Sequence, residues 1–115
     1  MSMEPISGDA LRGHLESMIL ATLERGEAHG FEVWRRLEEA GRGALRLKEG
    51  SLYPALYRLE EAGLVASAWE DGPAGRGPRR RVYHLTRKGG RRLAEGRAAW
   101  QQFIAVVGGI LGAQA

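Results

Sequence analysis

Basic side chains are concentrated in one short stretch of this 115-residue chain, and their chemistry suits the binding of a polyanion. Residues 76–92 contain eight Lys and Arg residues and no Asp or Glu. The other 9 Lys and Arg residues are opposed by all 14 Asp and Glu residues, so the rest of the chain is acidic although the net charge is +3. A cationic cluster on an acidic protein is typical of a nucleic-acid-binding surface, although a solvated charged surface gives the same pattern.

The residue types that catalyse reactions or bind metals are not arranged for either role. The chain has no cysteine, which excludes disulfides, thiolate ligands and a cysteine nucleophile. Its three histidines, His14, His29 and His84, have neither metal-ligand spacing nor a carboxylate at a convincing offset. The glycine-rich residues 72–77 do not join a strand to a helix, so they do not predict a phosphate-binding loop. We therefore expect no enzyme activity, no metal and no cofactor.

The segment 50–65 predicts a short helix that leads directly into a strand. One narrow arc of its helical wheel is apolar and carries Leu52, Leu56 and Leu59. Gly63 is placed to end the helix, and residues 64–69 have the pattern of a strand. The opposite arc would face whatever the helix is presented to, and it carries Ser51, Pro54, Tyr57 and Arg58, with Tyr53 at its edge.

Pro54 limits where this helix begins, because proline has no N–H and is harmless only in the first turn. We expect the helix to start near Gly50 or Ser51, with Ser51 as a candidate cap.

A basic hairpin is expected after the helix. The turn-forming residues 71–78 separate the strand 64–69 from a second strand, residues 79–85. A helix followed by a basic hairpin is the layout of a winged helix-turn-helix, which presents a recognition helix to the DNA major groove. The candidate DNA contacts are Lys48, Ser51, Tyr53, Pro54, Tyr57, Arg58, Arg76, Arg79 and Arg80.

Two of these contacts have structural alternatives. Tyr53 is equally compatible with packing at the edge of the core with its hydroxyl in water. Arg58 has a competing intrahelical ion pair with Glu60 or Glu61.

Two helices are expected before the recognition helix. The first has Asp9 as its N-cap, Gly26 as its stop, and apolar residues at helical spacing: Leu11, Leu15, Met18, Ile19 and Leu23. The second follows His29-Gly30, ends at Gly41, and has an apolar face of Phe31, Val33, Trp34 and Leu37. Residues 44–47 have the pattern of a short strand, and Trp34 and Trp69 are expected in the core or in wing packing.

A final helix is expected over residues 87–112, with Thr86 as its N-cap. Its apolar residues follow the alternating steps of three and four of a heptad seam: Leu93, Gly96, Trp100, Phe103, Val107 and Ile110. Such a seam requires a partner, either the rest of its own domain or a second subunit. The predicted dimer interface consists of Leu11, Leu93, Trp100, Phe103, Val107 and Ile110.

These elements predict a mainly α fold of the α+β type. It comprises a winged helix-turn-helix with a two-stranded β-wing over residues 9–86 and a C-terminal dimerisation helix over residues 87–112, packed as one unit. The N-terminal residues lack a signal-peptide pattern, and the apolar run 103–113 is too short and glycine-rich to span a bilayer. We expect a cytoplasmic protein.

Several separated motifs resemble the PadR family of bacterial transcriptional regulators. They are His29-Gly30-Phe31-Glu32-Val33, the segment 50–56, Arg58-Leu59-Glu60, Gly63-Leu64-Val65, the segment 78–86, and Gly89. The resemblance extends roughly from Leu11 to Trp100. It is closest to the short subfamily, which has one C-terminal helix in place of a longer helical domain.

The resemblance implies a homodimeric repressor of a pseudo-palindromic operator, often near its own promoter. The last helix of one subunit would pack on the first helix of the other. Some short members bind flat aromatic or phenolic compounds in an apolar cavity at that interface, and binding releases the DNA. By position, Trp100 matches an aromatic residue that lines such a cavity, although ordinary dimer core is an alternative role. The candidate effector-binding residues are Trp100, Leu15 and Phe103.

Two other functions compete with this reading. One is a winged-helix protein-interaction module without operator binding, which would not need eight uncompensated positive charges. The other is RNA binding, for which the chain shows no aromatic base-stacking platform on a sheet.

Overall fold

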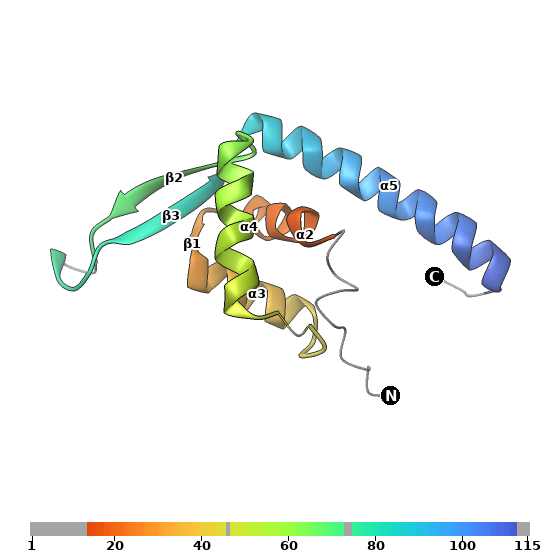
Figure 1. Ribbon diagram of the computed structural model, residues 1–115, viewed down its shortest axis with the longest axis horizontal. Coiled ribbons are helices and arrows are strands. Elements are labelled where there is room, and N and C mark those ends of the chain that lie inside the picture. The colour runs from red at the N-terminus through yellow and green to blue at the C-terminus, as the bar shows by residue number, and fades with distance from the viewer. Residues whose placement is uncertain (1–13, 46, 73–74, 113–115) are drawn as a thin grey trace.

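The computed structural model describes residues 14–45, 47–72 and 75–112 (Figure 1). In chain order the elements are α2 (Leu15–Glu24), β1 (Ala28–His29), α3 (Gly30–Ala40), α4 (Glu49–Glu61), β2 (Val65–Glu70), β3 (Arg80–Leu85) and α5 (Arg87–Leu111). Helices α2, α3 and α4 lie together, the β2–β3 hairpin projects from them as a wing, and α5 extends away in another direction (Figure 1). This confirms the predicted winged helix-turn-helix with a C-terminal helix.

The sheet has three antiparallel strands in the order β1-β3-β2. The wing pairs β2 with β3 from Val65 opposite Leu85 to Glu70 opposite Arg80. Strand β1 adds Ala28 opposite Tyr83 and His29 opposite Val82. The sequence predicted the two strands of the wing but not β1, because a two-residue strand is too short to show an alternating pattern.

The core joins all three helices of the bundle to the sheet and to the first turns of α5. Its fully buried side chains include Ile19, Leu20, Val33, Leu52, Leu56, Leu59, Val65 and Leu93. The predicted apolar arc of α4 is therefore confirmed, and its burial turns the opposite arc outward. Phe31 is an exception to the predicted face of α3: it is exposed and packs edge-on against Trp34, with ring centroids 5.9 Å apart.

Helix α4 begins earlier than predicted, at Glu49, with Lys48 in the N-cap position. The Ser51 amide donates to the Lys48 carbonyl at 2.9 Å, so Ser51 lies inside the first turn and is not the cap. Pro54 is then an interior residue, which costs about 3 kcal/mol in an isolated helix. Burial of the three leucines of α4 contributes roughly 1.5–3 kcal/mol each, enough to offset that cost.

The starts of two other helices agree with the sequence prediction, and Thr86 is the N-cap that was predicted. The His29 ring nitrogen Nδ1 accepts from the Glu32 amide at 3.2 Å and starts α3. The Thr86 hydroxyl accepts from the Gly89 amide at 3.0 Å and starts α5. The predicted cap Asp9, and Leu11 with it, lie outside the described residues.

Two further expectations concern residues 44–47 and the length of α5. The described residues of 44–47 are buried but form no strand, because Ala44, Leu45 and Leu47 pack into the core from the connection between α3 and α4. None of the described helices, α5 with its 25 residues included, is apolar enough over a sufficient length to cross a membrane.

Candidate nucleic-acid interface

The outward arc of α4 is exposed as the sequence predicted. Ser51, Pro54, Tyr57 and Arg58 all lie on the surface, and 64% of Tyr57 is exposed. Lys48, at the start of the helix, is also exposed. The arc thus presents hydroxyl, guanidinium and ammonium donors, the groups that contact phosphates and base edges in protein–DNA complexes.

Tyr53 combines packing with exposure. A Cβ atom added at Gly30 would lie 2.6 Å from Cε1 of Tyr53, so the ring rests directly on the first residue of α3. Half of the side chain, 51%, still remains exposed. The position of Tyr53 beside the outward arc therefore depends on glycine at residue 30.

The wing is braced against α4 by a polar network. Glu60 accepts from the Ser67 hydroxyl at 2.6 Å and from the Arg81 guanidinium at 3.0 Å, and Arg81 also donates to Ser67 at 2.7 Å. The Arg81 guanidinium carbon lies 5.7 Å from the centroid of the Trp69 ring. The hydrogen bond from Ser67 lowers the pKa of Glu60, burial opposes this change, and Arg81 lowers the pKa further. Arg81 and Glu60 therefore fix the angle between the wing and the recognition helix.

This network bears on the alternative role of Arg58. Glu60, one of the two predicted ion-pair partners of Arg58, is paired with Arg81 of the wing. Among the described residues, Arg58 forms no ion pair with a carboxylate. Arg58 is exposed.

The other wing arginines are solvent-exposed. Arg76 and Arg80 lie on the surface, and Arg79 makes an ion pair of 3.4 Å with Asp71 in which both side chains are largely exposed. A pair of this kind contributes little and is screened by salt. The wing therefore offers three guanidinium groups to an outside anion.

A groove joins the wing to the helices at the base of the interface. It has a volume of about 290 Å³ and is lined by His29, Gly30, Phe31, Tyr53, Arg80, Arg81 and Tyr83. Sequence reasoning did not assign His29 or Phe31 to this surface. Nothing in the sequence indicated it, because the pairing of β1 with β3 is what brings the start of α3 beside the wing.

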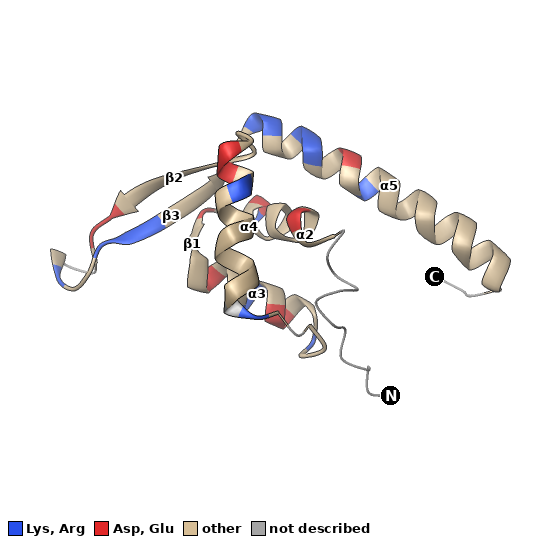
Figure 2. Cartoon of the chain, in the orientation of Figure 1, with Lys and Arg blue, Asp and Glu red and all other residues tan. Residues whose placement is uncertain are grey.

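The basic segment 76–92 divides into two surfaces in the structure. Figure 2 shows Lys and Arg on the outer part of the wing, including the start of β3, and again at the start of α5, with the inner part of β3 between them. The second group contains Arg87, Lys88, Arg91 and Arg92. This division agrees with the predicted strand over residues 79–85 and the predicted final helix over residues 87–112.

An apolar groove of about 390 Å³ lies between α2 and α5. It is lined by His14, Ser17, Met18, Ala21, Leu93, Gly96, Arg97 and Trp100. The Trp100 ring stacks on Phe103 with centroids 5.7 Å apart and meets His14 edge-on at 5.1 Å. Of the three predicted effector-binding residues, only Trp100 lines the groove. Phe103 stacks on Trp100 outside the lining, and Leu15 is buried in the core.

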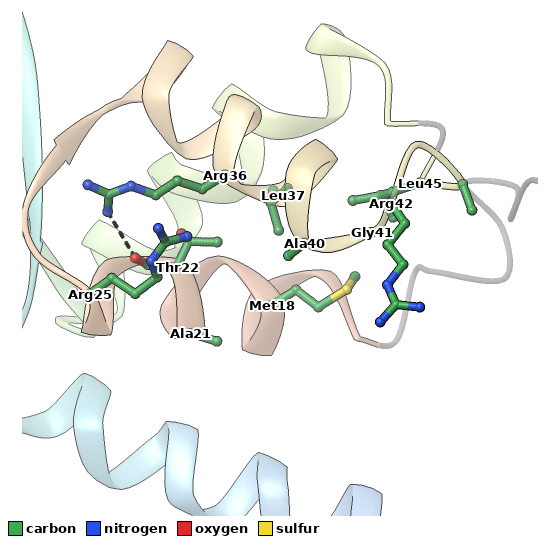
Figure 3. A pocket seen from close by; sticks show the side chains of 11 residues that line it. Met18, Ala21, Thr22, Arg25, Arg36, Leu37, Ala40, Gly41, Arg42 and Leu45 are labelled. Carbon is green, nitrogen blue, oxygen red and sulfur yellow. Dashed lines mark hydrogen bonds between the residues drawn. The ribbon is translucent and has the colours of Figure 1, made fainter. Parts of the chain in front are cut away.

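A second groove lies on the other side of α2, against α3 (Figure 3). It has a volume of about 690 Å³, and Met18 and Ala21 line both grooves. Arg36 closes its end by donating to the carbonyls of Thr22 at 2.9 Å and Gly26 at 2.8 Å. None of the predicted effector-binding residues lines this second groove.

The predicted seam of α5 has two unlike halves. Leu93 is only 2% exposed and packs into the core of its own subunit, so its burial requires no partner. In the other half, the seam residues Trp100, Phe103 and Ile110 are exposed and Val107 is partly buried. Val106 and Leu111, beside the seam, are exposed as well. In the part of the chain that the structure describes, no three His, Cys, Asp or Glu residues are grouped to hold a metal ion.

Comparison with known proteins agrees with this geometry. Residues 19–95 match the transcriptional regulator PadR-like family. Over 86 residues the chain is 40% identical to a transcriptional regulator of Mycobacterium tuberculosis, covering 72% of this chain and 73% of that protein. It is 31% identical over 85 residues to a transcriptional regulator of Escherichia coli, covering 74% of this chain but only 38% of that longer relative.

A solved structure is similar over nearly the whole chain. The crystal structure of a PadR-like transcriptional regulator from Bacillus cereus superposes with a TM-score of 0.78 at 30% identity, covering 93% of this chain and 100% of that one. With the family match extending over most of the chain, the protein belongs to the PadR-like family of transcriptional regulators.

Proposed function

We propose that the chain represses transcription by binding a pseudo-palindromic operator as a homodimer in the cytoplasm. In this proposal α4 enters the major groove and the wing arginines contact neighbouring phosphates. The observation that carries it is the exposed arc of Ser51, Pro54, Tyr57 and Arg58, held beside the three exposed wing arginines by the Arg81–Glu60 brace. A winged helix-turn-helix uses this arrangement to read duplex DNA.

The DNA interface is tested by the salt dependence of binding. Arg79→Ala with Arg80→Ala should weaken binding to all duplex sequences and lower the slope of log affinity against log salt by roughly one unit per lost phosphate contact. Gln101→Glu with Gln102→Glu is a matched control, since it changes the net charge equally on exposed positions of α5. An unchanged slope in the arginine variant would remove the wing from the interface.

The same titration separates the rival functions. A protein-interaction module would show no salt-dependent affinity for duplex DNA. An RNA-binding protein would prefer single-stranded RNA to the duplex at every salt concentration.

The exposed half of α5 supports the homodimer. A row of large apolar side chains on a helix surface is costly in water and marks an interaction site. A second copy of the chain fits it because a seam on α5 can meet the α2–α5 groove of its partner in a two-fold arrangement. Two recognition helices related in this way would read half-sites one or two helical turns apart.

A planar apolar effector is the proposed signal, and the groove beside Trp100 is its proposed site. The support is an apolar lining together with the stacked pair Trp100 and Phe103, a surface on which a flat ring can stack. Titration of tryptophan fluorescence with planar dyes and phenolic acids, in wild type and Trp100→Ala, tests this site. Trp34 and Trp69 provide a background that should not respond. Equal affinities in the two proteins would make Trp100 part of the dimer core only.

A further inference from the structure

The first two turns of α5 carry a cationic surface that the fold itself does not explain. Arg87, Lys88, Arg91 and Arg92 are all exposed, the first turn contains no acidic residue, and Glu95 is the first carboxylate of the helix. No ion pair joins these four side chains to a carboxylate among the described residues. We call Arg87, Arg91 and Arg92 the α5 arginine surface.

This surface lowers the stability of its own helix. Positive charge at a helix N-terminus opposes the macrodipole. Arg87 and Arg91 are spaced i,i+4, as are Lys88 and Arg92, and like charges at that spacing repel one another. Charged residues that destabilise their own helix without a compensating contact are typical of functional sites.

The surface is fixed rigidly to the recognition helix. At the end of α4, the Lys88 ammonium donates to the Ala62 carbonyl at 2.8 Å and the Thr86 hydroxyl to the Gly63 carbonyl at 2.7 Å. The Thr86 amide also donates to the Leu64 carbonyl at 3.2 Å. Lys88 therefore has a structural role, whereas the three arginines keep a constant position relative to α4.

The spacing along β3 separates this surface from the wing. Arg80 begins the six-residue strand and Arg87 follows its end, so the two groups lie roughly 20 Å apart along the strand. This separation exceeds the width of the major groove, which is about 12 Å. The two groups of side chains would therefore contact different segments of phosphate backbone.

Because α4 ends against the start of α5, we propose that the α5 arginine surface binds a second segment of phosphate backbone on the same duplex, separate from the segment that the wing contacts. This inference rests on the proposed DNA-binding function. It extends the interface beyond the recognition helix and wing to a third element.

The test uses the full-length chain and the double variant Arg87→Gln with Arg91→Gln. Glutamine favours helix, so the fold is retained, and loss of the repelling charges should raise the melting temperature. Loss of two phosphate contacts should lower the salt slope by about two units, so that the variant loses about tenfold less affinity than wild type between about 50 and 200 mM salt. Gln101→Glu with Gln102→Glu is again the charge-matched control.

The outcomes distinguish this inference from the function on which it rests. A lower salt slope combined with a higher melting temperature supports the second backbone contact. A wild-type slope in the Arg87/Arg91 variant, with a reduced slope in the Arg79/Arg80 variant, overturns the second contact and leaves the wing interface intact. No salt-dependent duplex binding by wild type would overturn both.

Discussion

Gly30 determines the position of Tyr53, a predicted DNA contact, because it has no side chain. The Tyr53 ring occupies the space that a side chain at residue 30 would need. Glycine in a helix interior lowers the stability of the helix by about 1 kcal/mol relative to alanine. At residue 30, the first of α3, glycine leaves the room that the Tyr53 ring needs.

We predict that Gly30→Ala displaces the Tyr53 ring, because an added Cβ would lie 2.6 Å from its Cε1 atom. Since this ring is half exposed and can move, the free energy of unfolding should fall by about 1 kcal/mol at most. Displacement of Tyr53 should also weaken operator binding. Denaturant unfolding and DNA titration measure the two effects.

The control for this change is Gly90→Ala, where an added Cβ meets nothing within 4 Å and a stabilisation is expected. In a Tyr53→Ala background, Gly30→Ala should likewise become stabilising. Destabilisation that persists in that background would mean that Tyr53 is not the cause.

The Glu60 carboxylate gives the brace between wing and recognition helix a defined pH dependence. Its pKa in the native state lies below the ordinary value of 4.5, mainly because the Ser67 hydroxyl donates to it. The unfolded chain therefore binds a proton at a higher pH than the native state does. The stabilisation is complete above that ordinary value and is lost as the pH falls through the lowered native pKa.

We predict that Glu60→Gln reduces stability by roughly 1 kcal/mol at neutral pH, since the network is partly exposed. The difference from wild type should shrink as the pH falls below about 4.5 and vanish in acid. Urea unfolding across the pH range measures it. Glu61→Gln, on an exposed neighbouring residue outside the network, is the matched control. A difference for Glu60→Gln that stays constant with pH would exclude the Glu60 carboxylate as its source.

At the scale of elements, the first half of α5 packs into the core, and its second half carries the proposed dimer interface. Its first half packs through Leu93 and Gly96, where a Cβ on Gly96 would lie 2.5 Å from the Ser17 hydroxyl oxygen. Its second half has few contacts with the rest of the chain and exposes its large apolar side chains. Changes in the second half should therefore affect association without unfolding the winged helix.

We predict that Val107→Glu with Ile110→Glu gives a monomer that retains a cooperative unfolding transition, because Ile110 is exposed and the partly buried Val107 lies outside the hydrophobic core. Sedimentation at micromolar concentration measures the change of state. The Gln101→Glu and Gln102→Glu variant should stay dimeric, as these residues lie off the seam. A wild-type protein that sediments only as a monomer would reject the dimer itself.

At the scale of the whole molecule, the grooves on both sides of α2 share Met18 and Ala21, and α2 packs against both α3 and α5. A ligand beside Trp100 would therefore press on the helix that connects the dimerisation half of α5 to the recognition unit. Such a ligand changes DNA affinity only if it binds the two arrangements of the dimer with different affinity.

We predict reciprocal coupling between the effector and the operator. A planar compound that weakens operator binding by some factor must itself bind more weakly, by the same factor, when the operator is present. Fluorescence titration with and without operator DNA measures this. The Val107/Ile110 variant should lose the coupling, because it has no second subunit to reposition. Coupling that is unchanged in that monomer would place the effect within one subunit.

The sequence alone determined the helices, the wing strands and the outward arc of α4, because these depend on local periodicity and on capping chemistry. The spacing of Leu52, Leu56 and Leu59 fixed which arc was buried. His29-Gly30 and Thr86 were recognisable in the sequence as helix starts. In the structure, His29 and Thr86 each accept a hydrogen bond from the amide three residues later. The family resemblance rested on the same local motifs.

Only the tertiary structure decided the contacts between residues far apart in the chain. Pairing of β1 with β3 brought Phe31, at the start of α3, beside the wing and formed the groove at the wing base. Glu60 forms its ion pair with Arg81, 21 residues away, instead of with Arg58. Helix α4 begins at Glu49, before Ser51, and Pro54 therefore lies in the helix interior. Burial of three leucines outweighs the local cost of that proline. Local patterns carry no information on such pairings, which depend on how distant segments share one core.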